Sequence, residues 1–120
     1  MSSSPRKSSA FVEWLVARHS DLAPILQEHR VDNGGLLPHV FFGDVTRYAS
    51  ELARRRDTAR LDPLLSDLDE ALTGSGDETD NLVWVSFVEN AQGTSGDAEE
   101  QLREELHAYP NLAGALSHYE

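Results

Sequence analysis

The chain has 120 residues, enough for one domain with a single hydrophobic core, and its 21 Asp and Glu outnumber its 10 Lys and Arg. It contains no cysteine, so disulfide and thiol chemistry are excluded. No apolar run reaches the roughly 18 residues of a membrane span. No secretory signal is recognisable near residue 1 either, so we expect a cytoplasmic protein.

Residues 1–8 are rich in serine and poor in apolar side chains. Little in them offsets the entropy lost on ordering, so we expect a flexible tail at 1–8 followed by a single domain at 9–120. Apolar residues then recur with helical spacing, and two helices are predicted within 9–31. Ser20 is the expected cap of the second helix, and Gly34 follows its end.

A third helix is predicted to begin near Pro38, because proline suits the first turn of a helix. Gly43 either lies inside this helix or marks a later start. The next helix is predicted to begin with Asp62 as its cap and Pro63 at its first position, and to end before Gly74. A stripe of leucines supplies its apolar face.

The segment 81–90, NLVWVSFVEN, fits two structures. Its valines and aromatic residues favour a strand, but that strand would be apolar on both faces and would need a partner on each edge. The only other strand-like stretch, 36–42, contains a proline and runs into a helical pattern. We therefore predict a mostly buried helix, with Ser86, Glu89 and Asn90 along a narrow polar seam.

A last amphipathic helix is predicted to end at Pro110, with a short turn or helix after it. The predicted fold is all-α, a compact bundle of about six helices. Two sequence echoes, offset by 39 and 37 residues, are near the period of HEAT-type helical hairpins, which would span 9–31, 38–73 and 77–109. An irregular bundle would bury the same residues and is the open alternative.

The histidines do not pair at a spacing of three or four residues, so no metal site and no cofactor are predicted. No nucleotide-binding or hydrolase motif is present. The carboxylates of Asp67 and Glu70 would serve acid–base chemistry only in a cleft, and a solvated helix face explains them more simply. The basic cluster 54–56 lies at a predicted helix C-terminus, where cations complement the helix dipole.

The net charge of −11 is concentrated in the second half of the chain. Residues 57–120 carry fifteen Asp and Glu against two Arg, which disfavours nucleic acid as a partner because phosphates would be repelled. Solubility alone explains an acidic surface, but a docking face for a basic protein explains it as well. The carboxylates assigned to this docking face are Asp67, Asp69, Glu70, Asp77, Glu78, Asp80, Glu99, Glu100, Glu104 and Glu105.

Two stretches, LLPHVFFGDVTRYASEL and DNLVWVSFVENA, resemble a family of small uncharacterised bacterial helical proteins, a domain of unknown function. The resemblance covers roughly residues 36–92, and its motifs are not catalytic signatures. In size, acidity and helical content the chain is also similar to immunity proteins of bacterial toxin systems. This second likeness is one of type, and it assigns no functional residues.

Three functions are compatible with these observations. The first is a non-enzymatic acidic module that binds a basic protein, as an immunity or antitoxin protein does, and we expect this one. The second is a small enzyme with its cleft at the seam formed by Glu89 and Asn90. The third is a structural helical adaptor or homodimer, and the sequence leaves the oligomeric state open.

Overall fold

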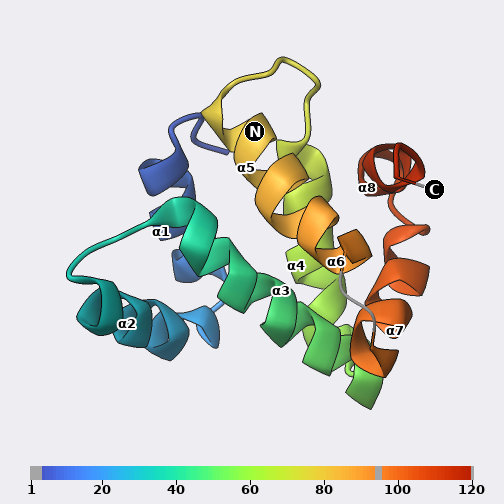
Figure 1. Cartoon of the computed structure of the whole chain (residues 1–120), viewed down its shortest axis with the longest axis horizontal. Helices are drawn as coiled ribbons and strands as arrows, with labels where there is room; N and C mark the ends of the chain where they lie inside the picture. The colour runs from blue at the N-terminus through green and yellow to red at the C-terminus, as the bar shows by residue number, and fades with distance from the viewer. Residues whose placement is uncertain (1–3, 94–95, 120) are drawn as a thin grey trace.

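The computed structural model describes residues 4–93 and 96–119. Within these residues every regular element is a helix and no strand occurs, which confirms the all-α prediction (Figure 1). None of the helices in this part of the chain is both long and apolar enough to cross a membrane.

The helices α1 (Ser8–Arg18) and α2 (Leu22–Asn33) follow each other after a short turn. Asp21 precedes α2 and the helix has no side-chain cap, so the prediction that Ser20 caps it is wrong. The backbone N–H groups of the first turn of α2 bond to carbonyls of the preceding turn instead. At the other end Gly34 has a φ of 69°, the left-handed conformation that glycine adopts without strain and that commonly ends a helix.

Helix α3 (Pro38–Arg55) begins at the proline that the sequence indicated, where the missing N–H has no helical partner to lose. It continues through Gly43 without interruption. Buried residues recur along it at steps of three and four, which makes it strongly amphipathic. The buried apolar side chains of this face are Phe41, Phe42, Val45, Ala49, Leu52 and Ala53.

Helix α4 (Thr58–Ala71) begins one turn earlier than predicted, and Pro63 lies inside it rather than at its first position. The reason is Leu61, which is fully buried together with the leucines that follow it. Burying Leu61 in helical geometry stabilises the turn that precedes the proline, and this offsets the backbone hydrogen bond that proline cannot donate. The helix ends at Ala71, and Gly74 takes a φ of 79° in the loop beyond.

The segment that the sequence left between strand and helix is helical throughout. Helix α5 (Glu78–Val83), the π-helix η1 (Trp84–Val88) and helix α6 (Glu89–Gly93) follow one another without a break. The wider winding of η1 appears in the bond from the Glu89 N–H to the Trp84 carbonyl, five residues back. The prediction of a helix at 81–90 is confirmed, but it is less buried than predicted, because Val85 is 40% exposed.

The polar seam predicted on this helix is only partly exposed. Glu89 and Asn90 are exposed, but Ser86 is buried and its Oγ lies 2.5 Å from Nδ1 of His39. The Ser86 carbonyl accepts hydrogen bonds from Asn90 Nδ2 at 2.7 Å and Thr46 Oγ1 at 3.3 Å. Within the seam, Asn90 therefore donates a hydrogen bond to a backbone carbonyl of the π-helix. The backbone hydrogen bonds of a π-helix run from residue i to i+5, unlike those of an α-helix.

The C-terminal helices are α7 (Asp97–Leu106) and α8 (Pro110–Ser117), and Pro110 separates them as predicted. Because α5, η1 and α6 form one continuous rod, the described part of the chain contains seven helical rods, close to the six expected. In Figure 1 α1 and α2 lie at one end of the molecule, and α7 and α8 lie at the other.

The arrangement is an irregular bundle built around α3. This helix packs against α1, α2, α4, α5, η1, α6 and α7. In a HEAT-type stack each helical hairpin would contact only its neighbours along the chain. The structure therefore does not support the repeat suggested by the two sequence echoes, and the alternative of an irregular bundle describes it.

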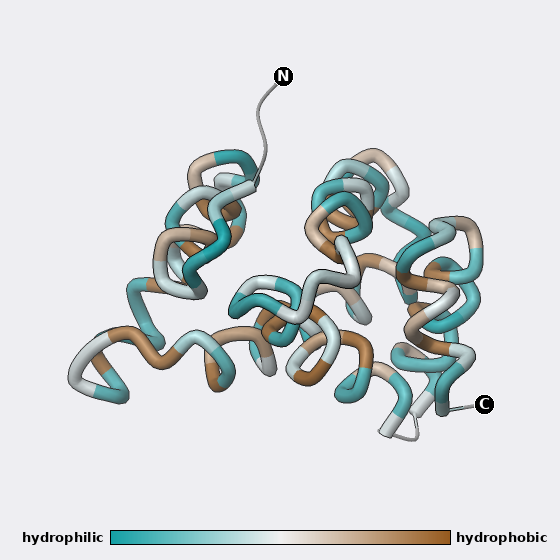
Figure 2. The backbone as a smooth tube through the Cα atoms, turned by 90° about the horizontal axis from the view of Figure 1, so that it is seen from above, coloured by the Kyte–Doolittle hydropathy of each residue, from teal (hydrophilic) through white to brown (hydrophobic). Residues whose placement is uncertain are grey.

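Aromatic residues fill the centre of the core. Phe11 of α1 lies 6.1 Å from Phe42 of α3, measured between ring centroids, and Phe41 meets Phe42 edge to face at 6.1 Å. Phe87 of η1 is fully buried as well. Figure 2 shows hydrophobic stretches of the backbone gathered where the helices face one another. Burying these side chains is the main source of stability for the bundle.

One buried carboxylate joins α1 to α4. Asp67 Oδ2 accepts a hydrogen bond from Arg18 Nε at 2.8 Å and lies 2.7 Å from His19 Nε2, while Oδ1 accepts from Arg18 Nη2 at 3.2 Å. The Asp67 side chain is only 7% exposed. This hydrogen bond from Arg18, with the negative charge of Asp67, raises the pKa of the arginine above its usual value.

We expect Asp67→Asn to lower the free energy of unfolding by about 1–3 kcal/mol, because it removes the charge that Arg18 and His19 face while keeping the side-chain shape. Urea denaturation followed by circular dichroism measures this difference. Glu70→Gln is the matched control on the exposed side of α4, and it should change stability by less than about 0.5 kcal/mol. Equal stability of Asp67→Asn and wild type would contradict the assignment.

Candidate functional site

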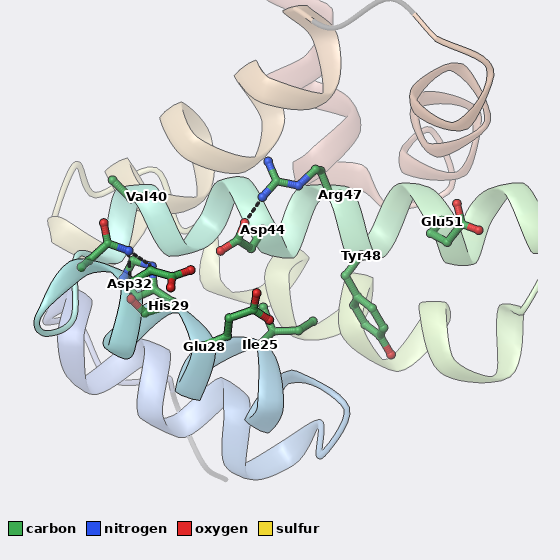
Figure 3. Close-up of a pocket in the computed structure, with 10 residues that line it drawn as sticks. Ile25, Glu28, His29, Asp32, Val40, Asp44, Arg47, Tyr48 and Glu51 are labelled. Atoms are coloured by element: carbon green, nitrogen blue, oxygen red, sulfur yellow. Dashed lines mark hydrogen bonds and ion pairs between the residues drawn. The ribbon is translucent and has the colours of Figure 1, made fainter.

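A groove of about 590 Å³ runs between α2 and α3 (Figure 3). Each helix contributes side chains spaced at steps of one, three and four residues, which lie on a single helical face. We call this site the α2/α3 groove. Its lining residues are Ile25, Glu28, His29, Asp32 and Asn33 from α2 and Val40, Asp44, Arg47, Tyr48 and Glu51 from α3.

The groove is closed at one end by His29, which is 3% exposed. Its Nε2 accepts a hydrogen bond from the backbone N–H of Leu37 at 3.0 Å, and its ring lies 5.7 Å from the Phe41 ring. Asn33 Nδ2 donates to the His29 carbonyl at 2.9 Å. These contacts fix the loop 34–37 and hold the start of α3 at a set distance from α2.

Several large apolar side chains are exposed on α2, α3 and the loop between them, and one of these, Val40, lines the groove. Val31, Leu37 and Val40 are 77%, 47% and 53% exposed, and they come from α2, the following loop and the first turn of α3. Large apolar side chains this exposed are few among the described residues. Exposed apolar surface within a groove, as Val40 provides here, is typical of a surface that binds another molecule.

Four carboxylates line the groove against one arginine. Glu28 and Asp32 are exposed, and neither has an ion-pair or hydrogen-bond partner among the residues that the structure describes. Asp44 pairs with Arg47 within α3. Glu51 pairs with arginines of the next turn, and the hydrogen bond from Arg54 lowers its pKa.

Tyr48 lines the groove in the part toward the C-terminal end of α3, where Figure 3 shows its side chain extending from the helix. Burial, followed by its hydrogen bond to Asp21 at 2.8 Å, raises the pKa of Tyr48 to about 12. The phenol is therefore neutral at physiological pH and donates a hydrogen bond to Asp21, which also accepts one from Arg60 at 3.0 Å. The groove thus combines a neutral, partly apolar floor with acidic edges.

The carboxylates predicted from sequence lie elsewhere, and the structure separates them. Asp67 is buried between α1 and α4, as described above. Asp80 is also buried, and it accepts backbone hydrogen bonds from Thr73 at 2.8 Å, Gly74 at 3.0 Å and Gly76 at 3.2 Å. Both side chains therefore hold the fold together and offer little charge to a partner.

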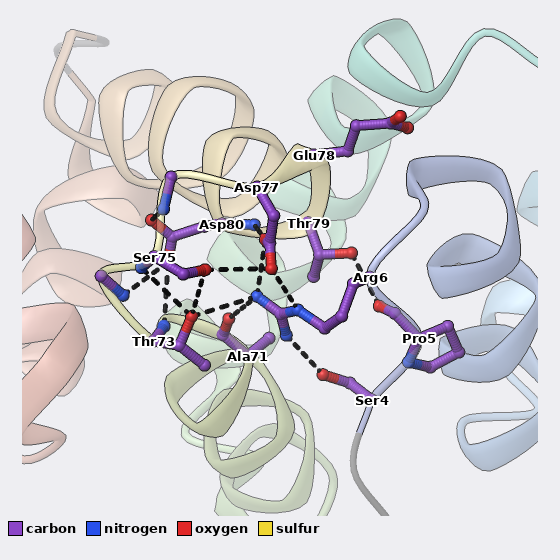
Figure 4. Close-up of polar contacts among 12 residues, drawn as sticks. Ser4, Pro5, Arg6, Ala71, Thr73, Ser75, Asp77, Glu78, Thr79 and Asp80 are labelled. Carbon is purple, nitrogen blue, oxygen red and sulfur yellow. Dashed lines mark hydrogen bonds and ion pairs between the residues drawn. The ribbon is translucent and has the colours of Figure 1, made fainter.

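Asp77 and Glu78 hold residues that were expected to belong to a flexible tail. The Arg6 guanidinium donates to Asp77 Oδ2 at 2.7 Å and Oδ1 at 2.8 Å, and to the Ala71 carbonyl at 3.0 Å (Figure 4). Asp77 also caps α5 by accepting the Asp80 N–H. The described residues before α1 are thus docked on the loop between α4 and α5.

Electrostatics at this contact favour the ionised carboxylates. The hydrogen bonds from Arg6, and then the one from the Asp80 backbone, hold the pKa of Asp77 well below its usual range. Hydrogen bonds from the Ser8 backbone and hydroxyl, followed by Lys7, lower the pKa of Glu78.

Asp69 and Glu105 lie near Tyr109, at the junction of α4, α7 and α8. Asp69 Oδ1 accepts the backbone N–H groups of Asn111 at 2.8 Å and Leu112 at 2.9 Å, which satisfies the first turn of α8. Burial, then the hydrogen bond that Tyr109 donates to Asp62, raises the pKa of the tyrosine to about 12, and the charges of Glu105 and Asp69 add to this. Asp69 therefore has a structural role as well.

The remaining predicted carboxylates are on the surface of α4 and α7. Glu70, Glu100 and Glu104 are exposed. Glu99 is partly buried and lines a cavity between α3 and α7. The ten residues thus form no single continuous face, and only part of the predicted surface is free to meet a partner.

Counting net charge could not find the α2/α3 groove, because the first half of the chain contains more basic than acidic residues. The arginines of α3 pair with carboxylates of their own helix and leave Glu28 and Asp32 unpaired among the described residues. A helical wheel of the carboxylates would have placed these two on one face of α2, because they are four residues apart.

The groups considered for metal binding or catalysis are placed by the structure as follows. No group of three or more potential metal ligands is assembled within residues 4–93 and 96–119. Glu89 is exposed, and its contact with a neighbouring side chain is the hydrogen bond donated by Tyr119 at 3.4 Å. The Ser86 hydroxyl next to His39 is buried and does not line any of the cavities described here.

We expect Arg6→Gln to lower the free energy of unfolding by about 1–2 kcal/mol at neutral pH, because the guanidinium holds Asp77 and the Ala71 carbonyl. The depressed pKa of Asp77 means that this stabilisation is present above its unfolded value of 3.8 and is lost as the pH falls through the lower folded value. Urea denaturation at a series of pH values should therefore show the two proteins converging below about pH 4.

The control for this experiment is Lys7→Gln, which removes a charge from an exposed pair with Glu78 and should have little effect at any pH. A constant difference between Arg6→Gln and wild type across the acid range would show that Asp77 is not the group concerned.

Comparison with known protein families gives one match for this chain. A family model for a domain of unknown function, DUF7674, matches residues 12–112. This confirms the expected likeness to an uncharacterised domain and extends it well beyond 36–92. No curated protein and no solved structure matches the chain with significance. Because the match covers most of the sequence, including both walls of the α2/α3 groove, the chain belongs to the DUF7674 family.

Proposed function

We propose that this protein is a non-enzymatic binding domain that takes a basic protein partner, and that the partner docks in the α2/α3 groove. An immunity or antitoxin protein of a bacterial toxin system, acting in the cytoplasm, would have this activity. The observation that carries the proposal is the combination of exposed apolar side chains with carboxylates that have no partner among the described residues.

The groove has the features of a site for an amphipathic basic segment. Val40 and Ile25 provide apolar surface, while Glu28 and Asp32 provide negative charge along one edge. From Ile25 to Asn33 the wall formed by α2 extends for about 12 Å, or two turns of helix. A partner helix with apolar residues on one face and lysine or arginine beside them would match both properties.

Electrostatics would contribute mainly to the rate and selectivity of binding. A net charge of −11 attracts a basic protein from a distance and repels nucleic acid. Each exposed ion pair formed at the groove would add at most about 1 kcal/mol, because water and salt screen it. The apolar contacts would therefore supply most of the affinity, and the carboxylates would select the partner.

The alternative surface is the outer face of α7, where Glu100 and Glu104 are exposed one turn apart. It belongs to the docking face expected from the sequence. It differs from the α2/α3 groove in that the groove lining includes two apolar side chains, Ile25 and Val40, and Val40 is 53% exposed. We therefore place the partner in the groove and use the α7 carboxylates as the matched comparison.

We expect the double variant Glu28→Gln/Asp32→Asn to weaken binding of a basic amphipathic peptide about three- to tenfold, because it removes two acceptors for cationic side chains. The probe is a synthetic helical peptide with leucine at positions i, i+3, i+4 and i+7 and lysine elsewhere. Fluorescence anisotropy at low and at physiological salt measures the affinity, which should fall as salt rises.

The control Glu100→Gln/Glu104→Gln removes the same charge from α7 and should change the affinity by less than about twofold. If the α7 variant loses more affinity than the groove variant, the docking face is the one expected from sequence. If neither variant differs from wild type, the proposal fails. A salt-resistant dimer in light scattering that buries the groove would favour the structural alternative instead.

A further inference from the structure

Arg47 of α3 lies between two cavities. It lines the α2/α3 groove, and it also lines a separate cavity of about 230 Å³ on the other side of α3. We call this second cavity the α3/α7 hollow, and its lining residues are Gly43, Thr46, Arg47, Ser50, Asn90 and Glu99. The Arg47 side chain is 74% exposed, so packing does not fix it on either side.

On the groove side Arg47 is paired with Asp44, three residues earlier on the same helix. Figure 3 shows Arg47 at the edge of α3 that faces away from α2, with its guanidinium reaching back to Asp44. An exposed pair of this kind is worth at most about 1 kcal/mol, so it breaks at little cost. While the Arg47–Asp44 ion pair is formed, it neutralises the Asp44 carboxylate. It also places the guanidinium where a lysine or arginine of a basic partner would bind.

The α3/α7 hollow offers Arg47 a second set of partners. The Glu99 carboxylate lines it, and no ion pair of Glu99 occurs among the described residues. Ser50, which is 2% exposed, also lines it, and its Oγ has no hydrogen-bond partner within the described structure. A buried hydroxyl without a partner is rare, and it marks a place where a donor would be stabilised.

We infer that Arg47 is a displaceable occupant of the α2/α3 groove, which a cationic side chain of the basic partner replaces at Asp44 while the guanidinium moves into the α3/α7 hollow beside Glu99. This inference rests on the proposed function. Arginine suits the role because its long, flexible stem lets the planar guanidinium reach either carboxylate, and it keeps its charge at either position.

The movement links the groove to α7. Binding in the groove frees the guanidinium, and pairing with Glu99 offsets the loss of Asp44. Arg47 therefore lowers the affinity for weakly basic ligands, which cannot displace it, more than for strongly basic ones. In this way a single residue makes the groove selective for partners with a high density of positive charge.

Three single variants and one double variant test this inference with the leucine–lysine peptide described above. Arg47→Gln should bind the peptide about two- to fivefold more tightly than wild type, because the competitor is gone. Arg30→Gln is the matched control. It removes the same charge from the exposed pair of α2 with Glu13, outside the groove lining, and its affinity should stay within about twofold of wild type.

The second part of the test is a double-mutant cycle. Glu99→Gln should weaken binding about twofold in the wild-type background, because the displaced arginine loses its new partner, and should have no effect in the Arg47→Gln background. The loss of one negative charge in Glu99→Gln would by itself weaken peptide binding equally with and without Arg47. The double-mutant cycle therefore subtracts this general electrostatic effect. In addition, the side-chain ¹⁵N resonance of Arg47 should shift on peptide addition in both wild type and Glu99→Gln, but by different amounts, because the guanidinium leaves Asp44 in both proteins and reaches a second carboxylate only in wild type.

The outcomes separate this inference from the proposed function. If the Glu28→Gln/Asp32→Asn variant loses affinity but Arg47→Gln binds no better than Arg30→Gln, the groove is the docking site and the role of Arg47 is refuted. A Glu99→Gln effect of the same size in both backgrounds refutes the movement into the α3/α7 hollow. If wild type does not bind the peptide at all, both proposals are overturned.

Discussion

Helix α3 and the buried face along it determine the rest of the molecule. Phe41, Phe42, Val45, Ala49 and Leu52 lose nearly all contact with water. At the usual value for burying such side chains this face contributes on the order of several kcal/mol of stabilisation, enough to fix which helices must cover it. α1, α4, the rod from α5 to α6, and α7 provide that cover. The N-terminal part of α3 also has a second face, toward α2, which is only partly covered and becomes the α2/α3 groove.

The π-helix is a consequence of the same packing. The rod from α5 to α6 crosses α3 with apolar side chains over most of its circumference, and the wider winding of η1 lets Phe87 and Val88 both face the core. The Ser86 carbonyl lies in this segment and accepts hydrogen bonds from the side chains of Thr46 and Asn90. In the sequence, Ser86, Glu89 and Asn90 look like a polar seam that could be catalytic. In the structure, the Asn90 side chain donates a hydrogen bond to a backbone carbonyl of this rod, so a structural role accounts for its position.

The acidic composition has two different roles in the structure. Four aspartates accept internal hydrogen bonds that join helices or cap them: Asp67, Asp69, Asp77 and Asp80. Their carboxylate oxygens are therefore occupied by groups of the protein itself. Long carboxylates such as Glu28 and Glu104 remain at the surface, where they are free to meet solvent or a partner. The four structural aspartates have oxygens close to the backbone, which suits them to bonding backbone N–H groups, whereas Asp32 has no such partner among the described residues; net charge does not show this difference.

Local sequence alone was enough to predict that the chain is all-α, that α3 begins at Pro38, that Pro110 stands between the last two helices, and that 81–90 is a helix. These follow from local spacing, from proline at a first turn and from the absence of strand partners, all of which act within a few residues. It did not determine the start of α4, because burial of Leu61 outweighed the local preference of Pro63, nor which carboxylates are free. Those outcomes depend on which side chains meet across the bundle. Only the tertiary structure brought Arg18 to Asp67, Arg6 to Asp77, and α2 alongside α3 to make a groove, because ion pairs and cavities form between residues that are distant along the chain.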